Sequence, residues 1–194
     1  MNEIIFLIKS STVDLKRYTI KDVQASSKRL DVIARCIISA LIDKDKFHVN
    51  HEALVFLDKY GGFKFDPKKL NYNTFPKNEL LVCDYFVKLI RGEDKEKNPL
   101  KQVETLSKGP VETIQALIKD GYEAFVLSEK GEPFKARLND ISKNEKLLFI
   151  VGSQTGEFVS SDAIKELCLT NISLGKKSYL ASQVIRLIKI KLRG

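Results

Sequence analysis

The stretch from Leu147 to Gly175, LLFIVGSQTGEFVSSDAIKELCLTNISLG, decides the fold of this 194-residue chain. Its first residues form a short apolar run that ends at Gly152, which predicts a strand followed by a tight turn. A helical segment over 161–168 and a second apolar run over 169–174 come next, and Gly175 ends that run. A strand, a helix and a strand in this order favour an α/β arrangement with parallel strands.

The same alternation extends outward in both directions. After Gly109-Pro110 the pattern predicts a helix over 111–119 and a strand over 124–128, and a closing helix over 178–192 ends the chain. We therefore predict an α/β fold with a mainly parallel sheet, helices on both faces and no internal repeat.

The closing helix carries apolar residues around much of its circumference: Leu180, Val184, Ile185, Leu187, Ile188, Ile190 and Leu192. A surface helix buries only one stripe. We expect this helix to be covered on two sides, either in the core or across a subunit interface.

The first half of the chain has its own α/β pattern. It predicts a strand over 3–9, a helix over 28–42 capped by Ser26 or Ser27, a strand over 53–57 and a helix that starts near Pro76 and stops at Gly92. The polar segment 93–109 is the best candidate for an insertion or hinge. We expect one domain over 1–194, with an N-terminal part over 1–92 and a second part over 110–194.

The composition excludes several classes of protein. The chain is 43% hydrophobic and 30% charged, which is too apolar for a disordered tail, and no apolar stretch is long enough for a membrane helix. The segment Met1–Lys9 lacks the features of a secretion signal, so we expect a soluble, cytoplasmic protein. The formal net charge is +8, carried mostly by lysine, which fits either a solubilising coat or a nucleic-acid partner.

Cysteine and histidine patterns point to no metal site. Cys36, Cys83 and Cys168 lie far apart in apolar runs, where buried, reduced thiols are expected. His48 and His51 form an H-x-x-H pair, but no further ligand completes a coordinating set.

Three turns after predicted strands are the candidate ligand site. They contain Gly152 and Gly156, Gly175, and the segment 126–134. Ligands of open α/β sheets bind beyond the carboxyl ends of the strands. None of the turns is a known phosphate fingerprint. Either the glycines only make tight turns, or the turns form a pocket for a flat ligand such as adenosine.

A second candidate site begins the first predicted helix, where Arg29, Asp31 and Arg35 occur. Arg29 and Asp31 are two residues apart and should project from different sides of the helix, whereas Asp31 and Arg35 are neighbours on one face. The pair is either an ordinary surface ion pair or a site where arginine binds phosphate and Asp31 a base edge.

A basic and aromatic stretch over 63–72 offers a third site. Lys64, Lys68 and Lys69 are interleaved there with aromatic residues. This combination is typical of surfaces that bind RNA.

Four segments together resemble a known family: ASSKRLDVIARCIISAL over 25–41, VLSEKGEPF over 126–134, FIVGSQTG over 149–156 and NISLGKKSYLASQVI over 171–185. They are similar, in matching order and over nearly the whole chain, to the archaeal tRNA pseudouridine-54 N1-methyltransferases, the TrmY family of the SPOUT class.

The resemblance implies a trefoil knot in the part over 110–194, S-adenosylmethionine as cofactor, a homodimer and tRNA as partner. The residues that it assigns to the cofactor are Leu127, Gly152, Leu174, Gly175, Lys176, Lys177, Ser178, Tyr179 and Val184. Two positions depart from the family pattern, since Val184 stands where a cysteine is frequent and Lys176 where a proline is expected.

The implied reaction is an in-line methyl transfer to N1 of pseudouridine, in which positioning of the reactants matters most. Asp31 would accept the N1 proton or orient the ring, and Arg29 and Arg35 would hold flanking phosphates. Three alternatives stay open: an N1-methyltransferase of a ribosomal RNA pseudouridine, a non-catalytic RNA-binding protein, and a nucleotide-binding regulator.

Overall fold

The computed structural model describes residues 2–152, 157–175 and 177–193. Its helices are η1 (Ile20–Asp22), α1 (Val23–Ser26), α2 (Leu30–Leu41), α3 (Glu79–Arg91), α4 (Pro110–Lys119), α5 (Phe134–Lys143), α6 (Asp162–Lys165) and α7 (Ala181–Leu192). Its strands are β1 (Glu3–Ser10), β2 (Ile42–Asp43), β3 (Lys46–Phe47), β4 (His51–Leu57), β5 (Gly61–Phe65), β6 (Glu104–Leu106), β7 (Glu123–Pro133), β8 (Lys146–Val151) and β9 (Thr170–Ser173).

Within these residues a seven-stranded sheet runs in the order β6-β5-β4-β1-β8-β7-β9. The strands from β4 to β9 in that order pair in parallel, which confirms the prediction of a mainly parallel sheet. The edge is different, because β5 pairs antiparallel with β4 and β6 antiparallel with β5. The reversal at Gly61 uses a φ of +90°, which glycine adopts without strain.

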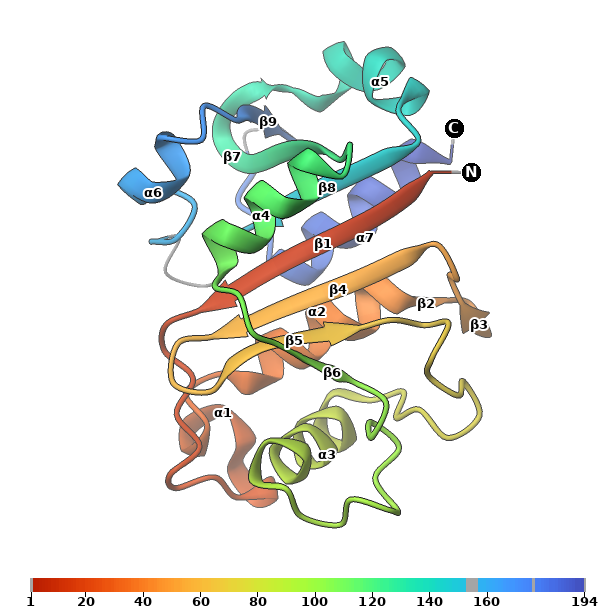
Figure 1. The fold of residues 1–194 in the computed structure, drawn as a ribbon, viewed down its shortest axis with the longest axis vertical. Helices are drawn as coiled ribbons and strands as arrows, with labels where there is room; N and C mark the ends of the chain where they lie inside the picture. Colours follow the sequence, from red (N-terminus) through yellow and green to blue (C-terminus); the bar gives the residue numbers. More distant parts are fainter. Residues whose placement is uncertain (1, 153–156, 176, 194) are drawn as a thin grey trace.

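Helices cover both faces of the sheet, as predicted (Figure 1). Along β1, Ile4, Phe6 and Ile8 point into the core shared with α2, α3 and α7, whereas Ile5 and Leu7 point into the core shared with α4 and α6. This alternation follows from the two-residue period of a strand, and it explains why β1 is apolar on both faces.

β7 is longer than predicted and contains a break in its pairing with β9. Leu127 and Glu132 both pair with Ile172, so the residues between them leave the ladder. At Gly131 an added Cβ would lie 2.6 Å from the backbone of Asn171 and Ile172. Only glycine allows this close approach of the two chain segments.

Lys189 of α7 holds the end of α2. Its buried ammonium donates to the carbonyl oxygens of Ser39, Ala40 and Ile42 at 2.7, 2.9 and 3.0 Å. Those carbonyls include ones that the helix itself leaves unpaired. Burial lowers the pKa of Lys189 to about 8. This contact fixes α7 against α2, the helix that carries Asp31.

Several local predictions were wrong. The segment 134–143 is a helix that the mostly polar sequence did not reveal, and the expected helix over 161–168 is reduced to α6. Cys168 is exposed, because it follows this short helix with a φ of +52°, while Cys36 and Cys83 are buried as expected. The closing helix α7 is buried on one side only by the described residues, since Ile190 keeps 64% of its surface exposed. Within the described part of this chain, the predicted cover on a second side is therefore absent at Ile190.

Candidate functional site

The carboxyl ends of β7, β8 and β9 open into a cavity of about 680 Å³. The three turns predicted as a ligand site all contribute to its walls. The described residues that line it include Val151, Gly152, Leu127, Ser128, Glu129, Lys130, Ile172, Ser173, Leu174 and Gly175, together with residues 177–181, Val159, Ser160, Val184 and two residues of the α2 region, Arg29 and Val32.

The predicted cofactor residues meet at this cavity. Those that line it are Leu127, Gly152, Leu174, Gly175, Lys177, Ser178, Tyr179 and Val184. Lys176 lies outside the described residues. Val184 reaches the cavity from α7, so the substitution of the family's frequent cysteine leaves an apolar contact in the wall.

Ser173 shapes the last of the three turns, a role that the sequence reading missed. Its hydroxyl accepts a hydrogen bond from the Gly175 amide at 3.2 Å, and it lies 3.3 Å from the carbonyl oxygens of Glu129 and Gly175. Gly175 has a φ of +127°, a conformation that favours glycine. Ser173 therefore ties the turn after β9 to the turn after β7.

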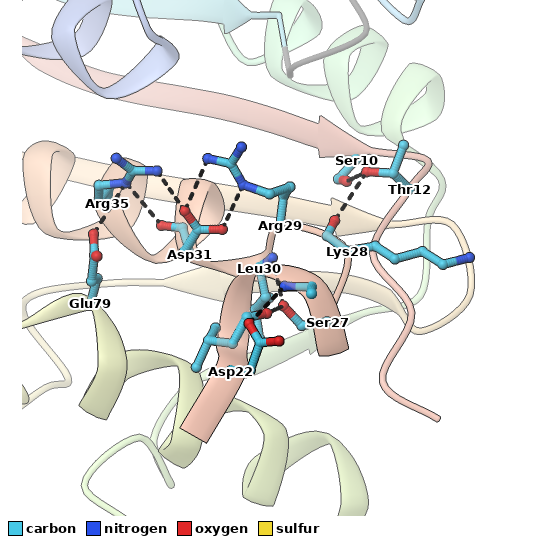
Figure 2. Close-up of polar contacts among 12 residues, drawn as sticks. Ser10, Thr12, Asp22, Ser27, Lys28, Arg29, Leu30, Asp31, Arg35 and Glu79 are labelled. Carbon is cyan, nitrogen blue, oxygen red and sulfur yellow. Dashed lines mark hydrogen bonds and ion pairs between the residues drawn. The ribbon is translucent and has the colours of Figure 1, made fainter. Parts of the chain in front are cut away.

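A buried ion cluster lies beside the cavity at the start of α2 (Figure 2). Arg29 donates to the Asp31 carboxylate through Nε at 3.0 Å and through Nη2 at 3.1 Å. Arg35 donates to the same carboxylate at 2.6 Å, and its Nε lies 3.2 Å from the carboxylate of Glu79. The predicted pairing of Asp31 with Arg35 is confirmed.

The expectation that Arg29 and Asp31 project from different sides was wrong. Arg29 precedes the helix and has a left-handed backbone with a φ of +77°, which turns its side chain back over the first turn of α2. The spacing rule for helical residues does not apply to it.

The members of the cluster differ in exposure. The Asp31 side chain is 1% exposed, whereas the side chains of Arg29 and Arg35 are 37% and 31% exposed. Asp31 is not among the residues that line the cavity, but Arg29 is. The hydrogen bonds that Arg29 donates to Asp31 raise the pKa of Arg29 above its ordinary value, so its guanidinium stays charged. A ligand in the cavity thus meets the arginine, and the carboxylate lies behind it.

The structure does not bring Lys64, Lys68 and Lys69 to the cavity. β5 runs antiparallel to β4, so the segment that follows Phe65 lies toward the amino ends of the parallel strands. Lys64 pairs with Glu52 at 2.9 Å, and Lys69 pairs with Glu104. Any role of these lysines belongs to a surface separate from the cavity.

Comparison with known proteins gives relatives that match nearly the whole chain, although no protein-family model matches it. The chain is 25% identical, over 197 aligned residues, to the tRNA (pseudouridine(54)-N(1))-methyltransferase of Thermococcus onnurineus, with 95% of this chain and 94% of that protein covered. It is 24% identical to the enzyme of the same name from Thermococcus kodakarensis, over 97% of this chain and 98% of that one.

Solved structures share the fold. Archaeoglobus fulgidus Nep1, determined bound to S-adenosylhomocysteine, matches with a TM-score of 0.68 at 14% identity and covers 100% of this chain and 98% of its own. The SpoU methyltransferase AviRb from Streptomyces viridochromogenes, determined in complex with AdoMet, matches with a TM-score of 0.51 at 15% identity, over 99% of this chain and 57% of its own. The chain therefore has the fold of these methyltransferases.

Proposed function

We propose that this chain, which belongs to the TrmY family of SPOUT methyltransferases, transfers a methyl group from S-adenosylmethionine to N1 of the pseudouridine at position 54 of tRNA. One observation carries the proposal. The segments that are similar to the family are far apart in the sequence, yet they line one cavity, and Arg29 from the first of them stands at its edge.

The described walls of the cavity suit S-adenosylmethionine. About 680 Å³ lies within the usual range for cofactor sites. Leu127, Ile172 and Val184 offer apolar surface for an adenine ring, and the glycine turns leave backbone groups accessible for its polar edge. When bound, this cofactor supplies an electrophilic methyl group.

The chain itself positions the base that receives the methyl group. Arg29 and Arg35 would bind the phosphates on either side of an extruded nucleotide, because the planar guanidinium matches phosphate oxygens. Asp31 would orient the two arginines, since its carboxylate is buried and already accepts hydrogen bonds from both. Glu129 is the one carboxylate among the described residues of the cavity wall, so the N1 proton can pass to it.

The architecture of the working enzyme is also part of the proposal. We infer a homodimer, supported by Leu180 and Ile190, which expose 54% and 64% of their surface beside the cavity and on α7. We infer that residues 110–194 form a trefoil knot that binds the cofactor, and that residues 1–92 contribute to tRNA binding. No helix within the described residues is long and apolar enough to cross a membrane, and we propose that the enzyme acts in the cytoplasm.

The test is mass spectrometry of tRNA transcripts after incubation with the protein and S-adenosylmethionine. Transcripts with pseudouridine at position 54 should gain one methyl group, and transcripts with uridine there should gain none. Equal methylation of both would reject the specificity, and preference for a pseudouridine-containing ribosomal RNA fragment would favour the ribosomal alternative. Absence of both methylation and S-adenosylhomocysteine binding, measured by calorimetry, would reject the enzyme in favour of a non-catalytic RNA-binding protein.

A further inference from the structure

The turn that leads into α2 contains two strained residues in succession. Lys28 and Arg29 have φ values of +49° and +77°, although neither is glycine. Side chains at positive φ clash with the backbone, and each such residue costs on the order of 1 kcal/mol or more. The surrounding structure must therefore hold this turn, and the turn places Arg29 at the cavity.

Ser27 makes side-chain hydrogen bonds that hold the turn at Lys28 and Arg29 (Figure 2). Its side chain is buried, and its hydroxyl accepts a hydrogen bond from the Leu30 amide at 3.0 Å and donates one to the carbonyl of Val23. Arg29 occupies the N-cap position without a capping side chain. Ser27 therefore satisfies the first free amide of α2 from three residues earlier, across the strained turn.

Two more hydrogen bonds hold the same turn. The Arg29 amide donates to the carbonyl of Gln24 at 3.0 Å, and the Thr12 hydroxyl, from the segment after β1, donates to the carbonyl of Lys28 at 3.4 Å. With both ends of the turn held, the Arg29 side chain lies over Asp31, and its Nε and Nη2 are at hydrogen-bonding distance from the Asp31 carboxylate.

We propose that Ser27 is a positioning residue for the methyl transfer, acting through Arg29. The proposal rests on the proposed function, in which Arg29 binds RNA at the cavity. Removal of the Ser27 hydroxyl would let Lys28 and Arg29 relax toward negative φ, and the guanidinium would leave both the carboxylate and the cavity edge. The arginine would then remain in the chain but no longer be held where the RNA arrives.

The neighbouring serine provides a matched control. Ser26 also makes two hydrogen bonds through its hydroxyl, accepting from the Thr19 amide at 2.9 Å and donating to the Thr19 carbonyl at 3.2 Å. Neither of these hydrogen bonds involves Lys28, Arg29 or Leu30. Ser26→Ala thus removes as many hydrogen bonds from the same segment and leaves Arg29 in place.

A double-mutant cycle with Arg29→Ala tests the route of the effect. Ser27→Ala should lower kcat/KM for tRNA by roughly tenfold, as expected for loss of one charge-assisted contact, and Ser26→Ala by less than about twofold. In the Arg29→Ala background, Ser27→Ala should have no further effect. An equal tenfold loss in both backgrounds would overturn the proposal, because Ser27 would then act independently of Arg29.

A second measurement does not depend on methylation. In nitrogen-15 NMR of the full chain, the Arg29 Nε–H signal, assigned by its loss in Arg29→Lys, should be protected from exchange in the wild type and in Ser26→Ala but not in Ser27→Ala. Protection that survives in Ser27→Ala would reject the positioning role, whatever the enzyme assay shows. If Ser27→Ala fails to fold, Ser27→Cys supplies the folded variant, because the thiol fills nearly the same space but is only a weak donor and acceptor, and the Arg29 signal should lose its protection there as well.

Discussion

The cavity has two walls built on different principles. On the α2 side, Arg29 lines the cavity, and the buried Asp31 carboxylate behind it binds both Arg29 and Arg35, so hydrogen bonds fix the direction of each charged group. On the side of the strand ends, the described wall is formed mainly by turns, apolar side chains and glycines, with Glu129, Lys130 and Lys177 as its charged residues. Next to this wall, the backbone of Asn171 and Ile172 leaves no room for a Cβ at Gly131.

This difference predicts opposite sensitivities. A wall of oriented charges should respond strongly to an isosteric change that removes charge, because the hydrogen bonds to the buried carboxylate are charge-assisted and a buried amide in its place would turn an N–H2 donor toward other donors. A wall formed by close backbone approach should tolerate changes of polarity but not added volume. The two walls can therefore be disabled separately, one for RNA and the other for the cofactor.

The largest effect is expected from added volume at Gly131. Its new Cβ in Gly131→Ala would lie 2.6 Å from the backbone of Asn171 and Ile172, which cannot move aside as a flexible side chain can. We expect a loss of about 4 kcal/mol or more in the free energy of unfolding, measured with urea, together with loss of S-adenosylhomocysteine binding.

Gly152→Ala is the matched control on the same wall. Among the described residues its Cβ would meet only the side chain of Val159, at 3.4 Å, which is ordinary contact. The variant should stay folded with a stability close to that of the wild type, while its affinity for S-adenosylhomocysteine falls because the added methyl group narrows the cavity. Equal stability of both variants would show that β7 and β9 are not constrained at Gly131.

The charged wall should respond to Asp31→Asn. This change keeps the shape of the side chain but weakens the hydrogen bonds from both arginines and buries an amide N–H2 against donors, and we expect about 3 kcal/mol of lost stability. kcat/KM for tRNA should fall by about a hundredfold, a factor of ten for each charge-assisted contact, with cofactor affinity unchanged. An unchanged methylation rate would remove Asp31 from the mechanism.

Glu79→Gln separates the buried carboxylate from an exposed one in the same cluster. The Glu79 carboxylate lies 3.2 Å from Nε of Arg35, and the Glu79 side chain is 37% exposed. Solvent screens such a pair, so the free energy of unfolding of the variant should fall by less than about 1 kcal/mol, and the variant should keep most of its methylation activity. A loss as large as that of Asp31→Asn would mean that Arg35, and not Asp31, organises the cluster.

The two walls also differed in how far the sequence revealed them. Apolar runs that end in glycine identified β8 and β9 and the turns after them, because a strand and its turn are local patterns. The left-handed turn at Lys28 and Arg29 was not predicted, since helical periodicity was extended through it. The place of Lys64, Lys68 and Lys69 was not predictable either, because it depends on β5 pairing antiparallel with β4.

The free energy of unfolding should depend on pH through His51, a buried residue outside both walls. His51 begins β4 and stacks on His48, with ring centroids 3.4 Å apart. Burial lowers the pKa of His51 from 6.5 to about 2. Folding therefore favours the neutral ring. Above pH 6.5 the ring is neutral in both states and protonation costs no stability. As the pH falls below 6.5, His51 takes up a proton in the unfolded state but not in the folded one, so the free energy of unfolding falls.

Between pH 6.5 and 4.5, His51 alone should lower the free energy of unfolding by about 2 to 3 kcal/mol. His51→Phe cannot take up the proton, and its ring can keep the edge contact that His51 makes with Phe6. Urea unfolding of the variant should depend on pH less steeply than that of the wild type, by about one proton. Parallel stability curves for the two proteins would show that His51 is protonated in the folded state as easily as in the unfolded one.

The smallest effect concerns charge far from either wall. Lys68 is exposed beyond β5, and no carboxylate partner of its ammonium is found among the described residues, unlike Lys64 and Lys69. If RNA extends over this surface, Lys68→Gln should reduce the slope of log affinity against log salt by about 0.7 to 0.9, one phosphate contact. Lys97→Gln, in the polar segment 93–101, should leave the slope unchanged. An unchanged slope for both would confine the phosphate contacts to the α2 side, where Arg29 lines the cavity and Arg35 binds the same Asp31 carboxylate.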